Sequence, residues 1–272
     1  MWNSIKDFFL KFFKKKQKEL DLKFGWLKDE FDARDFLFSA TPVPQKVYNP
    51  VDLRPNCPPV LDQRNLGACT AFGAIELVQF ARKKQQFKDQ WQPSPLFTYY
   101  TTRALQNTTN IDSGASVRYA LKSVVKDGVI EERLWPYVIE KFAEKPPDIL
   151  YRRATNYQAL SYRRLKDNSI DEMLECLDQG YPFIFGMQIY DSFIYCKKTG
   201  IIPMPNREKE FLHSGHCMMC VGWKKIGQKK YFIVQNSWSA KWGDRGYCYI
   251  PFEYLGSQIY ASDFWMIRIM EN

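Results

Sequence analysis

The hydrophobic pattern between Cys69 and Lys84 predicts the most deeply buried helix of the chain. Apolar residues lie on nearly every side of this stretch, and a helix that is apolar all round usually lies in the centre of a protein. Gly67 precedes it, and three consecutive basic residues close it, where positive charge suits the negative end of the helix dipole. We therefore expect a central helix over residues 69–84.

Other helices and strands follow in a clear order. Shorter helical patterns cover about residues 116–126 and residues 169–177. Four short β-type runs separated by turn residues come later, at 183–187, 217–221, 231–234 and 246–250. Helices first and strands afterwards favour an α+β fold. We expect a helical lobe, an antiparallel sheet or barrel lobe, and a cleft between them.

The first twenty residues carry a pattern of their own. Apolar residues recur at three- and four-residue steps and predict an amphipathic helix over 2–20; they are Trp2, Ile5, Phe9, Phe12 and Phe13. Three interpretations stay open. The helix packs on the body of the protein, it belongs to a pro-segment over a functional cleft, or it contacts a membrane surface.

A linker separates this region from the body. Residues 23–35 are rich in acids and lack periodicity, and Pro42, Pro44 and Pro50 indicate extended chain. We therefore divide the chain into an N-terminal extension over 1–50 and a two-lobed domain over 51–272. No stretch approaches the roughly 20 apolar residues that a spanning helix needs.

Composition narrows the partners and the compartment. The net charge is +9, with 39 basic and 30 acidic residues, but no zinc-finger spacing, phosphate loop or basic-aromatic repeat accompanies it. We expect no nucleic-acid partner. Seven cysteines are an odd and sparse set, and no signal peptide is recognisable. We expect reduced thiols inside a cell or a virus particle rather than classical secretion.

Candidate chemistry begins with the histidines, because the chain has only two, His213 and His216. His216 opens one predicted strand, and Asn236 ends the next. If these strands are neighbours, the Asn236 amide oxygen can hold one nitrogen of the His216 ring. Histidine is the side chain best suited to proton transfer near neutral pH.

A nucleophile and an oxyanion donor are expected across the cleft. Cys69 stands at the start of the central helix, and a helix N-terminus and a nearby imidazolium both favour a thiolate. The side-chain amide of Gln63, six residues upstream, is placed to donate to an oxyanion beside the cysteine's own N–H, as in acyl transfer.

A metal site is the alternative use of the histidines. The spacing of His213, His216, Cys217 and Cys220 resembles that of zinc ligands. Strand alternation, however, sends the two cysteines to opposite faces. We therefore expect no metal, and His213 is interpreted as a loop residue or a contact at the cleft rim.

With these residues in view, the chain resembles the papain-like cysteine peptidases. The segments that carry the resemblance are 51–54, 62–72, 214–216 and 235–243. The resemblance spans about residues 51–270, and the cysteine-to-histidine spacing of 147 residues, from 69 to 216, fits that family's own pattern. It implies that Cys69 is the nucleophile, His216 the general base and then acid, Asn236 its orienting partner, and Gln63 part of the oxyanion hole.

The resemblance also implies where substrate binds. Trp238 shields the histidine–asparagine pair, and the wall that pairs with an extended peptide lies around Gly114. An acidic residue at the far end of the main pocket suits a basic substrate side chain. The predicted substrate-binding set is Gly67, Ser113, Gly114, Gly215, Trp238, Ser262 and Asp263.

Some positions depart from the family pattern. Leu66 and Thr70 replace a common half-cystine and a tryptophan, and Gly215 stands where many relatives carry Asp. Only about fifty residues precede Val51, so a long helical prodomain is not expected. The leader is closer in style to bacterial and large-DNA-virus members.

The expected function is an endopeptidase that acts on peptide or protein substrates through a thioester intermediate. It needs no metal or organic cofactor, and residues 1–50 are expected to gate the cleft. The alternative is an inactive papain-like module used for binding. The sequence leaves the oligomeric state open.

Overall fold

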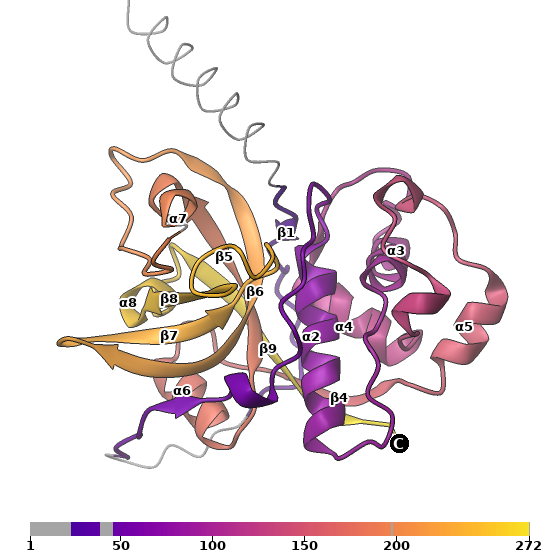
Figure 1. Ribbon diagram of the computed structural model, residues 1–272, viewed down its shortest axis with the longest axis horizontal. Helices are drawn as coiled ribbons and strands as arrows, with labels where there is room; N and C mark the ends of the chain where they lie inside the picture. Colours follow the sequence, from indigo (N-terminus) through magenta and orange to yellow (C-terminus); the bar gives the residue numbers. More distant parts are fainter. Residues whose placement is uncertain (1–22, 39–45, 197, 272) are drawn as a thin grey trace, which may run out of the picture.

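The computed structural model describes residues 23–38, 46–196 and 198–271. A sheet lobe and a helical lobe lie side by side, and the helix α2 (Cys69–Lys84) runs along their boundary (Figure 1). This helix has the predicted limits, and its side chains are almost all buried. The amphipathic helix expected over 2–20, as well as Pro42 and Pro44, lies outside the described residues.

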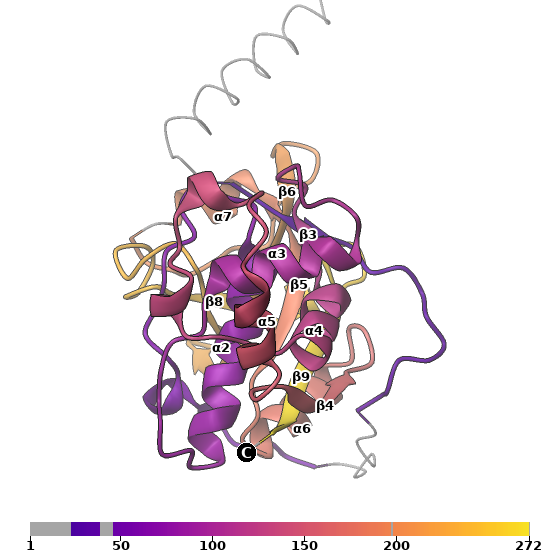
Figure 2. The same cartoon turned by 90° about the vertical axis from the view of Figure 1, so that its right-hand side faces the viewer.

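The helical lobe packs against one side of α2 (Figure 2). Its helices are α3 (Pro95–Leu105), α4 (Val117–Lys126) and α5 (Asp148–Ala154), with the short 3₁₀ turns η2 (Glu132–Leu134) and η3 (Ile139–Lys141). Ser94 caps α3 by accepting the N–H of Phe97, and Ser116 caps α4 in the same way. The sequence predicted α4 but not α3.

The other side of α2 faces an antiparallel sheet. Its path is β4-β9-β5-β6-β7-β8, and β2 pairs with β6 at Gly222 and Trp223, beyond the part of β6 that pairs with β5. The strands are β2 (Val51–Asp52), β4 (Ala159–Arg164), β5 (Phe183–Tyr190), β6 (Leu212–Ile226), β7 (Lys229–Gln235), β8 (Tyr247–Pro251) and β9 (Ala261–Met270). Among the described strands β4 and β8 do not pair, so the sheet is open and the barrel variant of our expectation is wrong.

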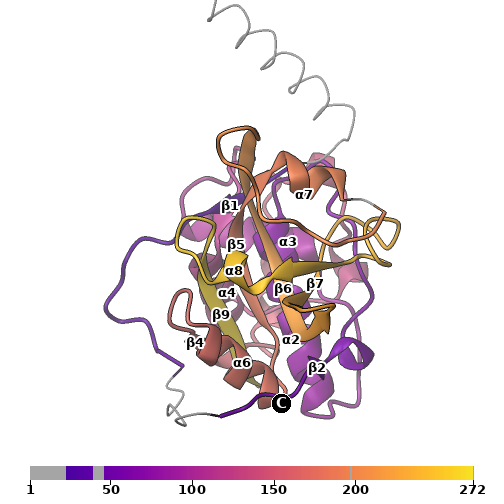
Figure 3. The same cartoon turned by 90° about the vertical axis from the view of Figure 1, so that its left-hand side faces the viewer.

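Short helices surround this sheet (Figure 3). They are η1 (Arg54–Asn56), α6 (Ile170–Asp178), α7 (Asp191–Tyr195) and α8 (Phe252–Leu255). Along β6, side chains alternate between two cores: Cys217 packs in the cluster that includes α2, and Cys220 packs in the cluster on the other face. In the described part of the chain, no helix is long and apolar enough to cross a membrane.

Residues 23–38 do not lie apart from the body. The strand β1 (Trp26–Leu27) pairs in parallel with β3 (Ala115–Ser116) of the helical lobe, and β1 also contacts β5 and β6 of the sheet lobe. Figure 1 shows this segment at the junction of the lobes. Part of the predicted extension therefore fills the space between the two lobes.

Candidate active site

His216 and Asn236 meet as the sequence predicts. β6 and β7 are neighbouring antiparallel strands, so His216 near the start of one lies beside the residue that follows the other. The His216 Nε2 and Asn236 Oδ1 atoms are 2.8 Å apart, and both residues are fully buried. The Trp238 ring stacks on the imidazole with centroids 4.7 Å apart. This bond fixes one ring nitrogen of His216.

Cys69 lies across the interface at the N-terminus of α2. The backbone N–H groups of Cys217 and Gly25 face its sulfur, which therefore lies beside the peptide that follows His216. The other ring nitrogen of His216, Nδ1, has no hydrogen-bond partner among the described residues. It is the atom left to receive a proton from the thiol.

Burial keeps both groups neutral in this structure. Loss of solvent raises the pKa of Cys69 to about 11, although the facing N–H groups offset part of the rise. Loss of solvent also lowers the pKa of His216 to about 4, against the opposing effect of the bond to Asn236. Burial by the covering segment therefore favours the neutral thiol of Cys69 and the neutral imidazole of His216.

The Gln63 amide is already occupied. Its Nε2 donates to the carbonyl oxygens of Lys23 and Leu66, each at 3.0 Å. Its Oε1 accepts a 2.6 Å hydrogen bond from the Ser237 hydroxyl. The predicted oxyanion donor thus holds a carbonyl of the chain's own N-terminal segment.

Ser237 is a site residue that the sequence reasoning missed. Besides orienting Gln63, it donates its backbone N–H to Asn236 Oδ1 at 2.8 Å. It therefore couples the oxyanion donor to the residue that holds His216. The sequence feature that could have identified Ser237 is its position directly after Asn236.

Two glycines of the predicted substrate-binding set, Gly67 and Gly114, contact the segment. The Gly25 carbonyl accepts the N–H of Ala115 at 2.7 Å, and a Cβ added to Gly25 would overlap the Gly67 carbonyl oxygen. A Cβ on Gly114 would overlap the Gly25 carbonyl in turn. The Ser113 hydroxyl instead bonds Thr108 Oγ1 and the Gly114 carbonyl within its own loop.

Trp26 fills the pocket that contains the other predicted residues. Its indole packs against Gly186 and Gly215, where a Cβ would overlap the ring. Its Nε1 donates to Asp263 Oδ2 at 3.0 Å, and the hydroxyl of neighbouring Ser262 is buried without a partner among the described residues. Gly186 was not predicted, although a glycine inside a strand often marks such a close approach.

Charged groups hold the segment beyond this pocket. Asp29 donates its N–H to Asp263 Oδ2 at 2.8 Å, and Asp35 bonds the guanidinium groups of Arg118 and Arg164 at 2.6 and 3.1 Å. Burial and the nearby Asp29 carboxylate raise the pKa of Asp263 to about 7. This cluster ties residues 29–35 to both lobes.

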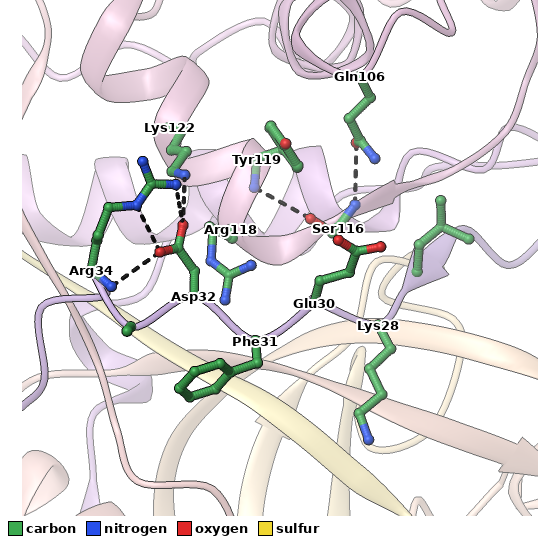
Figure 4. A pocket seen from close by; sticks show the side chains of 12 residues that line it. Lys28, Glu30, Phe31, Asp32, Arg34, Gln106, Ser116, Arg118, Tyr119 and Lys122 are labelled. Carbon is green, nitrogen blue, oxygen red and sulfur yellow. Dashed lines mark hydrogen bonds and ion pairs between the residues drawn. The ribbon is translucent and has the colours of Figure 1, made fainter.

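Figure 4 shows a hollow where the same segment runs over α4. Asp32 is bonded there by Arg34 and lies 3.8 Å from Lys122. None of the predicted catalytic residues lines this hollow. This hollow is therefore separate from the predicted catalytic site, which residues 23–29 cover.

Phe24 covers His216, the predicted general base. Its ring lies edge-on to His216 and Trp238, with centroids 6.0 and 5.8 Å apart. It also lies 6.2 Å from His213, whose Nε2 pairs with Asp191 Oδ1 at 2.9 Å. His213 belongs to strand β6, so its interpretation as a loop residue is wrong. Its contact with Phe24 agrees with a place at the rim of the covered site. Within the described residues, no group of His, Cys, Asp or Glu could hold a metal ion.

Comparison with known proteins agrees with this geometry. The model of the papain family of cysteine proteases matches residues 47–258. An uncharacterised peptidase C1-like protein of Acanthamoeba polyphaga mimivirus is 35% identical, over 90% of this chain and 86% of that protein. The structure of xylellain, a cysteine protease from Xylella fastidiosa, is 32% identical with a TM-score of 0.83, covering 92% of this chain and 97% of that one.

A more distant structure shares the fold. Digestive procathepsin L 3 of Tenebrio molitor has a TM-score of 0.68 at 16% identity, over 92% of this chain and 78% of that one. Given the family match and the close relatives, the chain belongs to the papain family of cysteine proteases, and it is a hydrolase of peptide bonds.

Proposed function

We propose that the protein is a cysteine endopeptidase held in a latent form by its own residues 23–38. The observation that carries the proposal is how this segment meets the catalytic groups. The Lys23 carbonyl takes the Gln63 amide, while an N–H, that of Gly25, faces the Cys69 sulfur. The peptide group of Gly25 turns its N–H toward the thiol instead of presenting its carbonyl carbon. In that orientation the segment would occupy the site without being cut.

Catalysis would begin when the segment leaves and water reaches the pair. His216 Nδ1 takes the thiol proton of Cys69, and the thiolate attacks the substrate carbonyl carbon. The oxyanion forms between Gln63 Nε2 and the Cys69 N–H. The imidazolium then protonates the leaving amine as the C–N bond breaks, which gives a thioester. Water, deprotonated by His216, hydrolyses the thioester and restores the thiol.

The remaining predicted residues receive roles in substrate binding. Gly67, Ser113 and Gly114 form the wall along an extended peptide, and Trp238 shields the histidine–asparagine pair from water. Gly215, Ser262 and Asp263 line the main side-chain pocket, a role supported by the place of Trp26 there.

The same proposal covers organisation and location. Residues 1–50 act as the gating extension and 51–272 as the peptidase domain. All seven cysteines are free, which suits the reducing interior of a cell or a virus particle. No metal, organic cofactor or nucleic acid takes part in the proposed mechanism.

Hydrolysis of a peptide library by the full chain and by its Gly25→Ala variant tests the proposal. The added methyl group collides with the Gly67 backbone and displaces the segment without altering the peptidase domain. We expect at least tenfold faster cleavage than by the parent, at internal bonds. Lys28→Ala, at an exposed position of the same segment, should match the parent, and Gly25→Ala combined with Cys69→Ala should be inactive.

Two results would contradict it. Equal rates for the parent and Gly25→Ala would exclude latency. Binding of peptides with no cleavage, and no labelling of Cys69 by a peptide electrophile, would favour the inactive binding module.

A further inference from the structure

From the contacts of Trp26 we infer that the emptied pocket selects a substrate side chain with a large aromatic body and a neutral N–H donor at its far end, tryptophan foremost. This inference rests on the proposed function and names the substrate class of the same site. The evidence is the pocket's size, its buried acceptor and its balance of charges.

The size of the pocket is set by two glycines. Gly186 on β5 and Gly215 on β6 lie diagonally across this strand pair, because Gly186 pairs with Cys217 and Gly215 pairs with Gln188. A methyl group on either would overlap the Trp26 indole. The pair therefore leaves room for a flat two-ring side chain, and smaller aliphatic side chains would leave part of that room unfilled, with a loss of contact energy.

The far end of the pocket is a hydrogen-bond acceptor. Asp263 is fully buried, and its Oδ2 accepts from the Trp26 indole and from the Asp29 N–H. Both donors belong to the segment and leave with it. Once the segment has left, water can take the place of these donors. A substrate side chain that covers Asp263 again displaces this water and leaves a buried acceptor unpaired unless it brings a donor, so a side chain with an N–H at this point binds better than one without.

Charge balance favours a neutral donor over a basic one. Asp29 and Asp35 leave with the segment, and the charged groups that stay are Asp263, Asp167, Arg164 and Arg118. Two carboxylates and two guanidinium groups cancel. Arg164 Nη2 already lies 3.4 Å from Asp263 Oδ1, so an incoming cation meets an acid whose charge is compensated. The presence of Asp263 alone had suggested a basic side chain.

Matched peptides test this inference with the full-length Gly25→Ala protein. Tryptophan, 1-methyltryptophan, phenylalanine, leucine and arginine are placed in turn at each of the three positions before the cleaved bond. At one position we expect kcat/KM for tryptophan to exceed that for 1-methyltryptophan by at least tenfold, because only the N–H is lost. The kcat/KM for the arginine peptide should not exceed that for the tryptophan peptide. Equal rates for the two indoles, or a preference for arginine, would overturn the inference.

Two substitutions of the acceptor sharpen the test. Asp263 has a φ of 60°, a conformation that Asn and Gly adopt readily. Asp263→Asn keeps an acceptor oxygen and should keep the discrimination between the indoles, whereas Asp263→Gly should abolish it. If all the peptides are cleaved but tryptophan is not preferred over 1-methyltryptophan, this inference fails and the proposed function stands. Failure to cleave any peptide or to label Cys69 defeats the proposed function as well.

Discussion

The backbone carbonyl of Lys23 lies 3.0 Å from the side-chain amide of Gln63, forty residues further along the chain. In the proposed mechanism that amide is a donor to the oxyanion. The contact is reinforced by an ion pair between Lys23 and Asp112. Asp112 also accepts the N–H of Gly67, two residues before Cys69. The covering segment is therefore fixed at the centre of the predicted catalytic site.

Removing the largest side chain of the segment should activate the protein. Trp26→Ala deletes the indole and its hydrogen bond to Asp263, which together stabilise the covered form by well over the 1.4 kcal/mol that equals a factor of ten. We expect at least tenfold faster peptide hydrolysis by the full chain. Lys28→Ala serves as the control, and an unchanged rate for Trp26→Ala would show that the pocket does not anchor the segment.

The state of the thiol should depend on the segment. Because burial raises the pKa of Cys69 to about 11, the covered form holds its proton at neutral pH and loses it only as the pH rises toward that value. Thiolate absorbance, measured against Cys69→Ala, should therefore be absent in the parent between pH 6 and 9. In the Gly25→Ala variant it should be present across that range, because the solvated imidazolium stabilises the thiolate. Thiolate in the parent at pH 7 would contradict the covered state.

Ser237 should act as a positioning residue. Ser237→Ala removes the hydroxyl that holds Gln63 Oε1, so the oxyanion donor loses its fixed direction. In the Gly25→Ala background we expect kcat to fall about tenfold with little change in KM, since the contact matters in the transition state. Ser257→Ala, in the turn before β9, is the control. A rise in KM alone would instead indicate a role in substrate binding.

Narrowing the pocket should change its preference. In Gly186→Ala the new methyl group takes the space of the indole, so the segment loosens and bulky substrates fit less well. We expect the full-length Gly186→Ala variant to hydrolyse peptides with small side chains faster than the parent does. The ratio of kcat/KM for tryptophan peptides to kcat/KM for valine peptides should be at least tenfold lower than in Gly25→Ala. An unchanged ratio would place substrate side chains elsewhere.

Part of this arrangement was predictable because it follows from local periodicity. The all-round apolar pattern of 69–84 predicted α2 and so placed Cys69 at its start. Adjacent strands placed His216 beside Asn236. Helix α3 was not predicted because its threonines are not typical of a helix interior. In the structure the hydroxyls of Thr101 and Thr102 donate hydrogen bonds to backbone carbonyls of the preceding turn.

The covering segment could not be predicted from periodicity. Residues 23–29 show no alternation, because they contact both lobes and use backbone groups for much of the contact, as in the bond from Ala115 to Gly25. Its main side-chain anchor joins Trp26 to Asp263, separated by 237 positions. A contact of that range becomes visible only once the lobes are in place.

The rate at which Cys69 is alkylated in the intact protein tests the central claim most directly. Iodoacetamide labelling at pH 7, resolved for each cysteine by mass spectrometry, compares the parent with Gly25→Ala and Lys28→Ala. We predict that Cys69 reacts at least ten times faster in Gly25→Ala than in the other two, while the buried Cys176 stays unreactive in all three. Equally fast labelling of Cys69 in all three proteins would contradict the account.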